Sequence, residues 1–314
     1  MKALKHILLV AGVAVAMMGA LTGCMNSVNY TYQDADKYTA GDRTISDKIE
    51  TIDIDYMSGD VTLKCGDSAD VTIKETANVE LDDKRKVHTW VDGNTLYVRY
   101  CASAKRLNFN KVDKQLDITI PKDVDLDNLK VDISSGEFDG SGFNANSLVV
   151  ESSSGEIKAD CNAKKIDLDV SSGNINLVQH GNSDEISMEA SSGEIVANIE
   201  NASKTDASVS SGNLNITANN INDIKAVSSS GDSKFSFGVA PELAEITASS
   251  GDVMVFVPED SDLKVNAKHS SGDFDYDLPF TKDGDSYVCG KATNIMKITT
   301  SSGDASINKL SSGE

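Results

Sequence analysis

The sequence has few aromatic residues, prolines and histidines, and it lacks the short motifs of the common enzyme classes. Aromatic side chains make up 5% of the 314 residues, and there are four prolines and four histidines. His6 lies in the amino-terminal segment, and His88, His180 and His269 are too isolated to predict a zinc site. No phosphate-binding loop, dinucleotide fingerprint or G-x-S-x-G sequence is present. A serine–histidine site around His269 therefore lacks a supporting motif, and the sequence predicts no catalytic residue.

Positive charge is also scarce. The chain has 29 lysines and arginines against 49 aspartates and glutamates. Without residues 1–23, which contain Lys2 and Lys5 and no acid, 27 basic and 49 acidic side chains remain, a formal charge of −22. This balance excludes nucleic-acid binding, which needs a basic face. It also argues against a protein that lies flat on anionic lipid.

Long hydrophobic runs are missing as well. The apolar stretch Ile7–Ala20 is too short for a comfortable membrane span. Two lysines precede it and the sequence Leu-Thr-Gly-Cys follows it, which predicts a lipoprotein signal peptide over residues 1–23. Cys24 would then receive a diacylglyceryl group, and two or more acyl chains would anchor the protein to the extracytoplasmic face of a bacterial membrane. An ordinary secretory signal that ends near a cysteine is the alternative.

The remaining sequence is dominated by a Ser-Ser-Gly repeat. The stretch Ile166–Val178, IDLDVSSGNINLV, is one copy of a unit that recurs from about Leu129 to Ile307. The central glycines are spaced by 19, 18, 20, 19, 19, 20, 21 and 31 residues. A fixed period of this size is typical of stacked repeats rather than of a globular enzyme. The glycines are Gly136, Gly155, Gly173, Gly193, Gly212, Gly231, Gly251, Gly272 and Gly303.

Within each copy, positions −7, −5, −3, +2 and +4 from the glycine are mostly apolar. Strict alternation predicts strands with one buried face. The change of phase at Ser-Ser-Gly predicts a corner, where glycine supplies a backbone conformation that other residues reach only with strain. We therefore predict an all-β fold, a single-stranded β-helix or solenoid. Its coils of about 19–20 residues lie about 4.8 Å apart, and the successive bends stack in register.

The composition divides the chain into four parts. Residues 1–23 form the signal peptide, and the polar residues 24–47 are predicted to be a flexible tether. Residues 48–125 are predicted to form a β-rich cap that starts with a divergent first copy around Gly59 and covers the first coil. Residues 126–314 form the solenoid, in which an insertion around Thr281–Thr293 precedes the last full copy at Gly303.

The corners carry the residues that could bind a ligand. The serine pairs could form a row of ligand-binding hydroxyls, but we interpret them as corner residues that hydrogen-bond to backbone or to the next coil. The residue after each glycine is acidic or Asn, and stacked carboxylates repel one another unless they are neutralised. A row of calcium ions is conceivable. Because no twelve-residue calcium loop is present, we expect solvent-facing acids that limit edge-on aggregation, with no metal and no cofactor.

Four cysteines follow Cys24. Cys65 and Cys161 both lie at position +6 from a corner glycine, which predicts buried free thiols. A disulfide between Cys65 and Cys101 is the alternative, and the spacing does not decide between the two. Cys289 and the other three lack any catalytic context.

The Ser-Ser-Gly-Asp/Glu/Asn series, Cys24 and the divergent first region together resemble a bacterial β-strand-repeat family of unknown function whose members are named as adhesins. The resemblance covers about Ile49 to Ile307. It implies a β-helix exposed on the cell envelope without established catalytic residues, and some relatives belong to envelope-stress responses. The expected function is non-enzymatic: surface interaction with an unknown protein or glycan, or stress sensing. A passive spacer and a glycan-acting β-helix enzyme are the alternatives.

Overall fold

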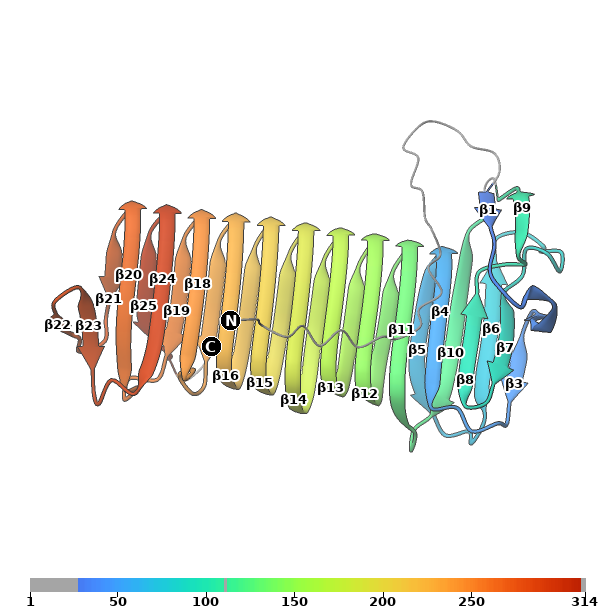
Figure 1. Cartoon of the computed structure of the whole chain (residues 1–314), viewed down its shortest axis with the longest axis horizontal. Coiled ribbons are helices and arrows are strands. Elements are labelled where there is room, and N and C mark those ends of the chain that lie inside the picture. The colour runs from blue at the N-terminus through green and yellow to red at the C-terminus, as the bar shows by residue number, and fades with distance from the viewer. Residues whose placement is uncertain (1–27, 110–111, 312–314) are drawn as a thin grey trace, which may run out of the picture.

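The computed structural model describes residues 28–109 and 112–311 as a rod of stacked β-coils with a β-rich cap at one end (Figure 1). Neighbouring central coils pair in parallel, residue by residue, so the predicted all-β solenoid is confirmed. Ten corner glycines stack along the rod, and at about 4.8 Å for each of the nine steps they span about 43 Å. The described residues contain one short 3-10 helix, η1 (Ala35–Lys37). They include no helix that is long and apolar enough to cross a membrane.

Five long strands build the middle of the rod. Each runs from the residues just after one corner to the serines of the next, with alternate side chains buried. In register, Val150 lies beside Leu168, which lies beside Met188 of the following coil. Each coil thus buries the apolar face that its neighbour would otherwise expose. The strands are β12 (Phe138–Ser154), β13 (Ile157–Ser172), β14 (Ile175–Ser192), β15 (Ile195–Ser211) and β16 (Leu214–Ser230).

The last two coils do not follow sequence order. The Gly251 coil is followed in space by the Gly303 coil, and the Gly272 coil lies outermost. The expectation that successive bends stack in order is therefore wrong at this end. The insertion after Gly272 forms a hairpin, and the chain then returns to place β24 between β18 and β20. The strands are β17 (Ser233–Phe237), β18 (Leu243–Ser250), β19 (Val253–Val257), β20 (Leu263–Ser271), β21 (Phe274–Tyr276), β22 (Thr281–Asp283), β23 (Ser286–Cys289), β24 (Asn294–Ser302) and β25 (Ala305–Lys309).

The opposite end is closed by the cap. β4 and β5 flank Gly59 and form the first coil, as the divergent first copy predicts, and β11 and β12 stack on one side of it. On the other side β8 pairs with β4 and β10 with β5, and the antiparallel β7 and β6 follow. The pairing edge of the first coil is thereby covered. The strands are β4 (Thr51–Ser58), β5 (Asp60–Gly66), β6 (Val71–Ala77), β7 (His88–Asp92), β8 (Thr95–Arg99), β10 (Lys114–Pro121) and β11 (Asp125–Ser135).

Residues 28–47 pack on the cap, whereas the sequence predicts a flexible tether over residues 24–47. β1 (Val28–Tyr30) pairs with β9 (Ala104–Leu107), and β2 (Thr39–Ala40) and β3 (Arg43–Ile45) pair with β7 and β6. The buried ring of Tyr30 keeps its hydroxyl bonded to the Asp55 carbonyl at 2.9 Å. Tyrosine combines a large apolar body with a polar tip, so a polar composition concealed these contacts. The predicted signal peptide and Cys24 lie outside the described residues.

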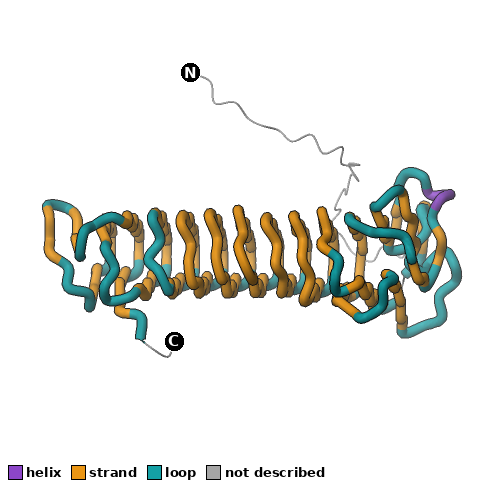
Figure 2. Tube along the Cα trace, turned by 90° about the horizontal axis from the view of Figure 1, so that it is seen from below, coloured by secondary structure: helices purple, strands orange, loops and turns teal. Residues whose placement is uncertain are grey.

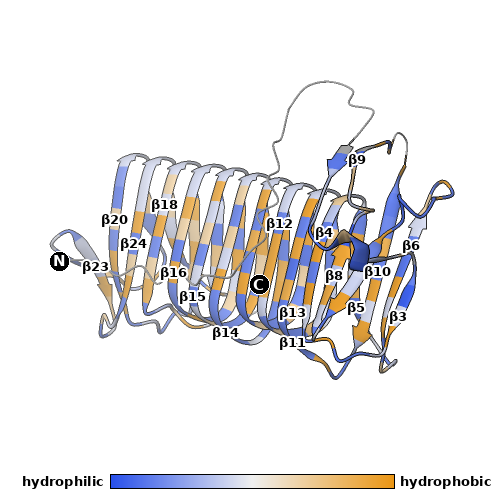
Figure 3. Ribbon diagram, turned by 45° about the vertical axis from the view of Figure 1, so that its right-hand side comes forward, coloured by the Kyte–Doolittle hydropathy of each residue, from blue (hydrophilic) through white to orange (hydrophobic). Residues whose placement is uncertain are grey.

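The interior of the rod is one continuous apolar core. Figure 3 shows apolar and polar residues alternating along the strands. Valine, isoleucine, leucine and alanine fill most of the narrow interior, which suits β-branched and small side chains. Loops gather at the two ends of the rod, with regular coils between them (Figure 2). The two ends are therefore the places where the repeat gives way to individual structure.

Candidate functional site

The Ser-Ser-Gly corners form a ladder along one edge of the rod. The ten corner glycines have φ between 104° and 145°. A Cβ atom built on any of them would lie 1.7–2.2 Å from a main-chain carbonyl oxygen of the preceding layer. Both the backbone conformation and the contact exclude any other residue. The glycines are therefore needed for stacking, which accounts for their spacing in the sequence.

The residue after each glycine is structural where it is Asp or Asn. Its side-chain oxygen accepts a hydrogen bond from the N–H of the equivalent residue in the next coil, at 2.8–3.1 Å in six junctions. Asp232 binds the N–H of Asp252 in this way, and Asp252 binds that of Asp304. The acids predicted to face solvent freely are thus engaged with backbone. These hydrogen bonds therefore tie each coil to the next one.

Glutamate at the same position reaches further. Glu137 binds the ammonium group of Lys158 at 2.7 Å, and Glu194 accepts from the side chain of Asn215 at 2.6 Å. In both pairs the partner lies three residues after the glycine of the next coil. The hydrogen bond that the Lys158 ammonium group donates to Glu137 is the main cause that raises the pKa of Lys158. Side-chain length therefore decides whether the acid binds backbone or a side chain of the next coil.

The serine pairs line the exposed side of the corner ladder. In the corners from Ser153 to Ser302 both serines are exposed. The carbonyl of the second serine accepts the N–H of the glycine in the preceding coil, for example Gly193 to Ser211 at 2.9 Å. The predicted role of the hydroxyl groups in joining the coils is therefore not what this bond shows, because it uses the main chain alone. The hydrogen bond that joins the coils here uses backbone rather than the hydroxyl groups.

The cysteines are free thiols in the described residues, including Cys65 and Cys101, so the alternative disulfide is not formed. Cys161 is buried as predicted, whereas Cys65 is only half-buried, with its sulfur 3.1 Å from the Gly142 carbonyl oxygen. Burial raises the pKa of Cys101 and of Cys161 to about 12. Such thiols stay protonated and are poor nucleophiles.

The three histidines of the described residues have different surroundings. His180 lies 2.8 Å from the Asp160 carboxylate, and Nδ1 of His88 lies 2.9 Å from the Lys86 carbonyl. His269 is exposed because its coil is the outermost one. Across residues 28–109 and 112–311, no three His, Cys, Asp or Glu side chains are placed to hold a metal ion.

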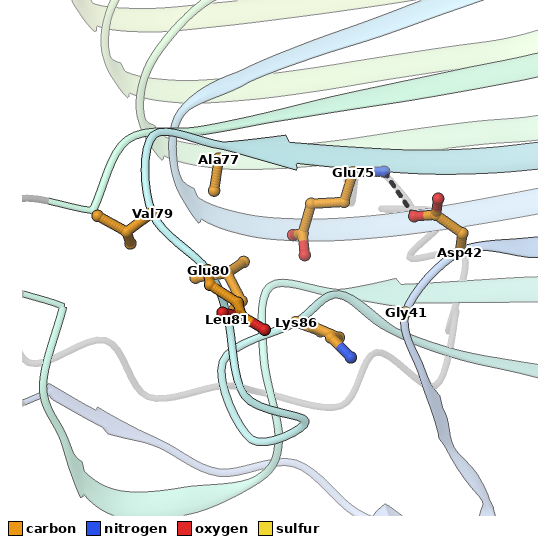
Figure 4. Close-up of a pocket in the computed structure, with 8 residues that line it drawn as sticks. All are labelled: Gly41, Asp42, Glu75, Ala77, Val79, Glu80, Leu81 and Lys86. Atoms are coloured by element: carbon orange, nitrogen blue, oxygen red, sulfur yellow. Dashed lines mark hydrogen bonds between the residues drawn. The ribbon is translucent and has the colours of Figure 1, made fainter.

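The cap contains a pocket of about 450 Å³ beside β6 (Figure 4). The N–H of Glu75 donates to the Asp42 carboxylate at 2.9 Å at its edge. The Glu75 carboxylate is bound by Lys114, by the Tyr56 hydroxyl and by the Val87 N–H. Since these contacts are all made within the cap, Glu75 is not free to bind a ligand in the pocket. The lining residues are Gly41, Asp42, Glu75, Ala77, Val79, Glu80, Leu81 and Lys86.

The outermost coil at the other end is open. β23 covers only Leu263–Val265 of β20, and β21 pairs with β25 on one edge alone. Four aromatic rings cluster beside it, with Phe274 and Tyr276 centred 4.9 and 5.3 Å from Tyr287. Tyr276 is 42% exposed. Free strand edges and exposed apolar surface lie together at this end of the rod. It is therefore the strongest candidate for a binding site.

Comparison with known proteins assigns the fold to a family. The sequence matches the profile of the Toastrack DUF4097 family over residues 49–308, which covers the first coil, most of the cap strands and the whole stack. The chain belongs to this family. For this Toastrack chain the predicted resemblance to a bacterial β-strand-repeat family is thereby confirmed. No match was found among curated proteins.

The solved structures that match this Toastrack chain share little sequence with it. A "putative adhesin" from Parabacteroides merdae is 13% identical, with a TM-score of 0.45 over 88% of this chain and 97% of that one. A "putative adhesin" from Bacteroides fragilis is 14% identical, with a TM-score of 0.33 over 86% and 96%. A "putative lipid binding protein" from Parabacteroides distasonis is 16% identical, with a TM-score of 0.36 over 87% and 97%. At this similarity the likeness carries no statement about function.

Proposed function

We propose that the chain is a lipid-anchored, non-catalytic rod on the extracytoplasmic face of a bacterial membrane, and that it serves surface interaction. The arrangement of the two ends carries this proposal. The described chain starts in the cap with β1, only a few residues after Cys24. A lipid on Cys24 would therefore hold the cap end near the membrane, and the Gly272 coil would be the part best placed to meet a partner.

The composition and the corners support the same proposal. A formal charge of −20 disfavours contact with anionic lipid along the sides of the rod. Apart from Asp273 in the outermost coil, the corner acids are occupied by backbone and side-chain bonds, and the described cysteines are free and largely buried. None of these groups is poised for acid–base or nucleophilic chemistry. The far end, in contrast, exposes apolar surface in one patch, which is typical of a binding site.

Two experiments test the proposal. Cells that express the chain are labelled with a fatty acid, and we expect label in the membrane-bound protein but not in the Cys24→Ser variant. The lipidated protein is then used to capture partners from native envelope fragments, in parallel with variants that carry charges on the far end or on the sides. Loss of capture with the far-end variants supports surface interaction. Capture that no surface variant changes supports a passive spacer, and release of sugar from envelope glycans would support the enzyme alternative.

A further inference from the structure

The Gly272 coil has the hydrogen-bonding pattern of a coil whose neighbour is missing. In nine successive junctions, the residue two positions after the corner glycine donates its N–H to the carbonyl one position after the next glycine. Val253 donates to Asp304 at 2.8 Å, and Ala305 to Asp273 at 2.9 Å. In the outermost coil this residue is Phe274. Among the described residues, β21 pairs with β25 on one side and no strand stacks on its other side. The Phe274 N–H therefore faces the end of the rod, and so does the Asp273 carboxylate, whose counterparts bind the next coil.

The core side chains of the Gly272 coil are also less buried than those of the coil before it. The core positions of the preceding coil, Ile298, Ala305 and Ile307, are at most 3% exposed. Their counterparts Ala267, Phe274 and Tyr276 are half-buried or exposed, because no further coil stacks on them among the described residues and the hairpin covers the two rings only in part, through Tyr287. One more coil would bury these apolar groups and supply the absent acceptor. An unfilled edge of this kind is where an extended chain adds to a sheet.

We propose that the end of the rod between Asn266 and Tyr276 binds an extended segment of a partner protein, which adds to the stack as one further parallel coil. The occupant follows from continuity with the nine coil junctions inside the chain. It needs a glycine opposite Gly272, because a Cβ would meet the Gly272 carbonyl oxygen as it would in every other junction. It also needs an apolar residue two positions later, which covers Phe274. Basic side chains in the segment would suit Asp273, as Lys158 suits Glu137.

A second copy of the chain fits this end less well. If two copies met end to end about a two-fold axis, their facing strands would be antiparallel. The alternation of inward side chains changes phase at the corner, so an antiparallel strand cannot keep its inward side chains in phase on both sides of the corner. Two copies could therefore match along β20 only, which would leave Phe274 and Tyr276 uncovered. A contact over one short strand is also smaller than stable interfaces require, at about 1,200 Å² or more in total.

The inference rests on the proposed binding role and names the partner class for it. The probe is a fluorescent peptide with the chain's own sequence Ile166–Val178, which contains one complete corner, added to the full lipidated protein in nanodiscs. We expect saturable binding, weakened about tenfold or more by Tyr276→Lys and by Ser270→Pro, which blocks the edge. A peptide with valine in place of its corner glycine, Gly173→Val, should also lose binding. The control is Val178→Lys in the protein, with the peptide unchanged. This valine is 37% exposed on the side of the rod, so its replacement should not alter peptide binding.

The outcomes separate the possible errors. Absence of peptide binding, or binding that Tyr276→Lys and Ser270→Pro leave unchanged, overturns the inference. A concentration-dependent dimer in sedimentation that Tyr276→Lys abolishes assigns the end to a second copy and also overturns it. If the peptide binds the end but envelope fragments yield no partner, the proposed function fails while the strand-addition site stands. If fragments bind through the sides of the rod, the function stands and the inference fails.

Discussion

Lys114 and Glu75 form an ion pair inside the cap, with Nζ and Oε1 2.6 Å apart and neither side chain more than 3% exposed. The ammonium group also donates to the Arg85 carbonyl at 2.8 Å and lies 4.0 Å from the centre of the Tyr100 ring. The pair joins β10 to β6, the two strands that cover the first coil on its β5 side. The closed end of the rod therefore depends on a buried charge that is fully paired.

Breaking this pair should destabilise the protein strongly. Lys114→Met leaves the Glu75 carboxylate buried without its counter-charge, which costs about 3–5 kcal/mol. Lys114→Met combined with Glu75→Gln should be more stable than Lys114→Met alone, because no buried charge remains. Urea denaturation followed by circular dichroism measures both. Lys122→Met, which removes the exposed pair with Asp67, should change stability by less than about 1 kcal/mol; an equal loss in this variant would contradict the argument.

The corner glycines should not tolerate a side chain. In Gly193→Ala the new Cβ would lie 1.8 Å from the Gly173 carbonyl oxygen, so the coils must separate or the chain must fail to fold. Gly142→Ala is the matched control, since this glycine also has a positive φ, 73°, but has nothing within 4 Å of the Cβ site. Gly142→Ala should lower the free energy of unfolding only by the cost of the left-handed backbone conformation for alanine, about 1–2 kcal/mol. Thermal denaturation compares them, and similar losses in both variants would show that stacking contact is not what requires glycine.

The residue after the glycine should be replaceable by its amide but not by alanine. Asp252→Ala removes the acceptor for the Asp304 N–H and should cost about 1–2 kcal/mol. Asp252→Asn should be close to neutral, because Asn213 makes the same bond in another junction. Hydrogen exchange of the Asp304 amide should accelerate in the alanine variant only. Asp223→Ala, at an exposed aspartate, is the control; if Asp252→Ala behaves like it, the row is not structural.

Asp55 should make stability depend on pH. Burial is the main cause that raises the pKa of its carboxyl to about 6, and its Oδ1 has no hydrogen-bond partner in the described residues. The folded pKa exceeds the ordinary value of 3.8. This group therefore favours folding most below about pH 4, and that contribution is lost as the pH rises through about 6. Asp55→Asn should stabilise the protein by about 1–3 kcal/mol at pH 7 and by little at pH 4. Denaturation at the two pH values measures this; a variant that is less stable at pH 7 would contradict it.

The regular part of the fold could be predicted from the sequence because its physics is local. Alternation such as Ile166, Leu168 and Val170 fixes which face is buried, and the fixed period places equal residues above one another. The spacing of the corner glycines predicted the ladder, because only glycine fits there. In this part of the rod each coil pairs with the coil that precedes it in the sequence, so the pairing of the strands could be predicted from the order of the repeats.

The sequence predicted a β-rich cap and an insertion, but the detailed contacts at the two ends could not be predicted, because they join distant segments. The 31-residue spacing before Gly303 indicated an insertion but not that β24 returns between β18 and β20. Lys114 and Glu75 carry no pattern that marks them as a pair. Tyr30 lies in a polar stretch that suggested a tether, and only the structure shows its ring in the core. The open Gly272 coil was missed for the same reason, since its exposure depends on the order of the coils.

Cysteine cross-linking at the far end tests the central claim most directly, namely that the Gly272 coil is the exposed last coil of the rod. In a Cys65→Ser background, the exposed positions Thr247, Thr299 and Lys268 lie at the same level of successive strands, with Thr299 in the middle. Under mild oxidation we expect disulfides in Thr247→Cys/Thr299→Cys and in Thr299→Cys/Lys268→Cys, and none in Thr247→Cys/Lys268→Cys. Efficient cross-linking of the last pair would place the Gly272 coil directly on the Gly251 coil and would contradict the account.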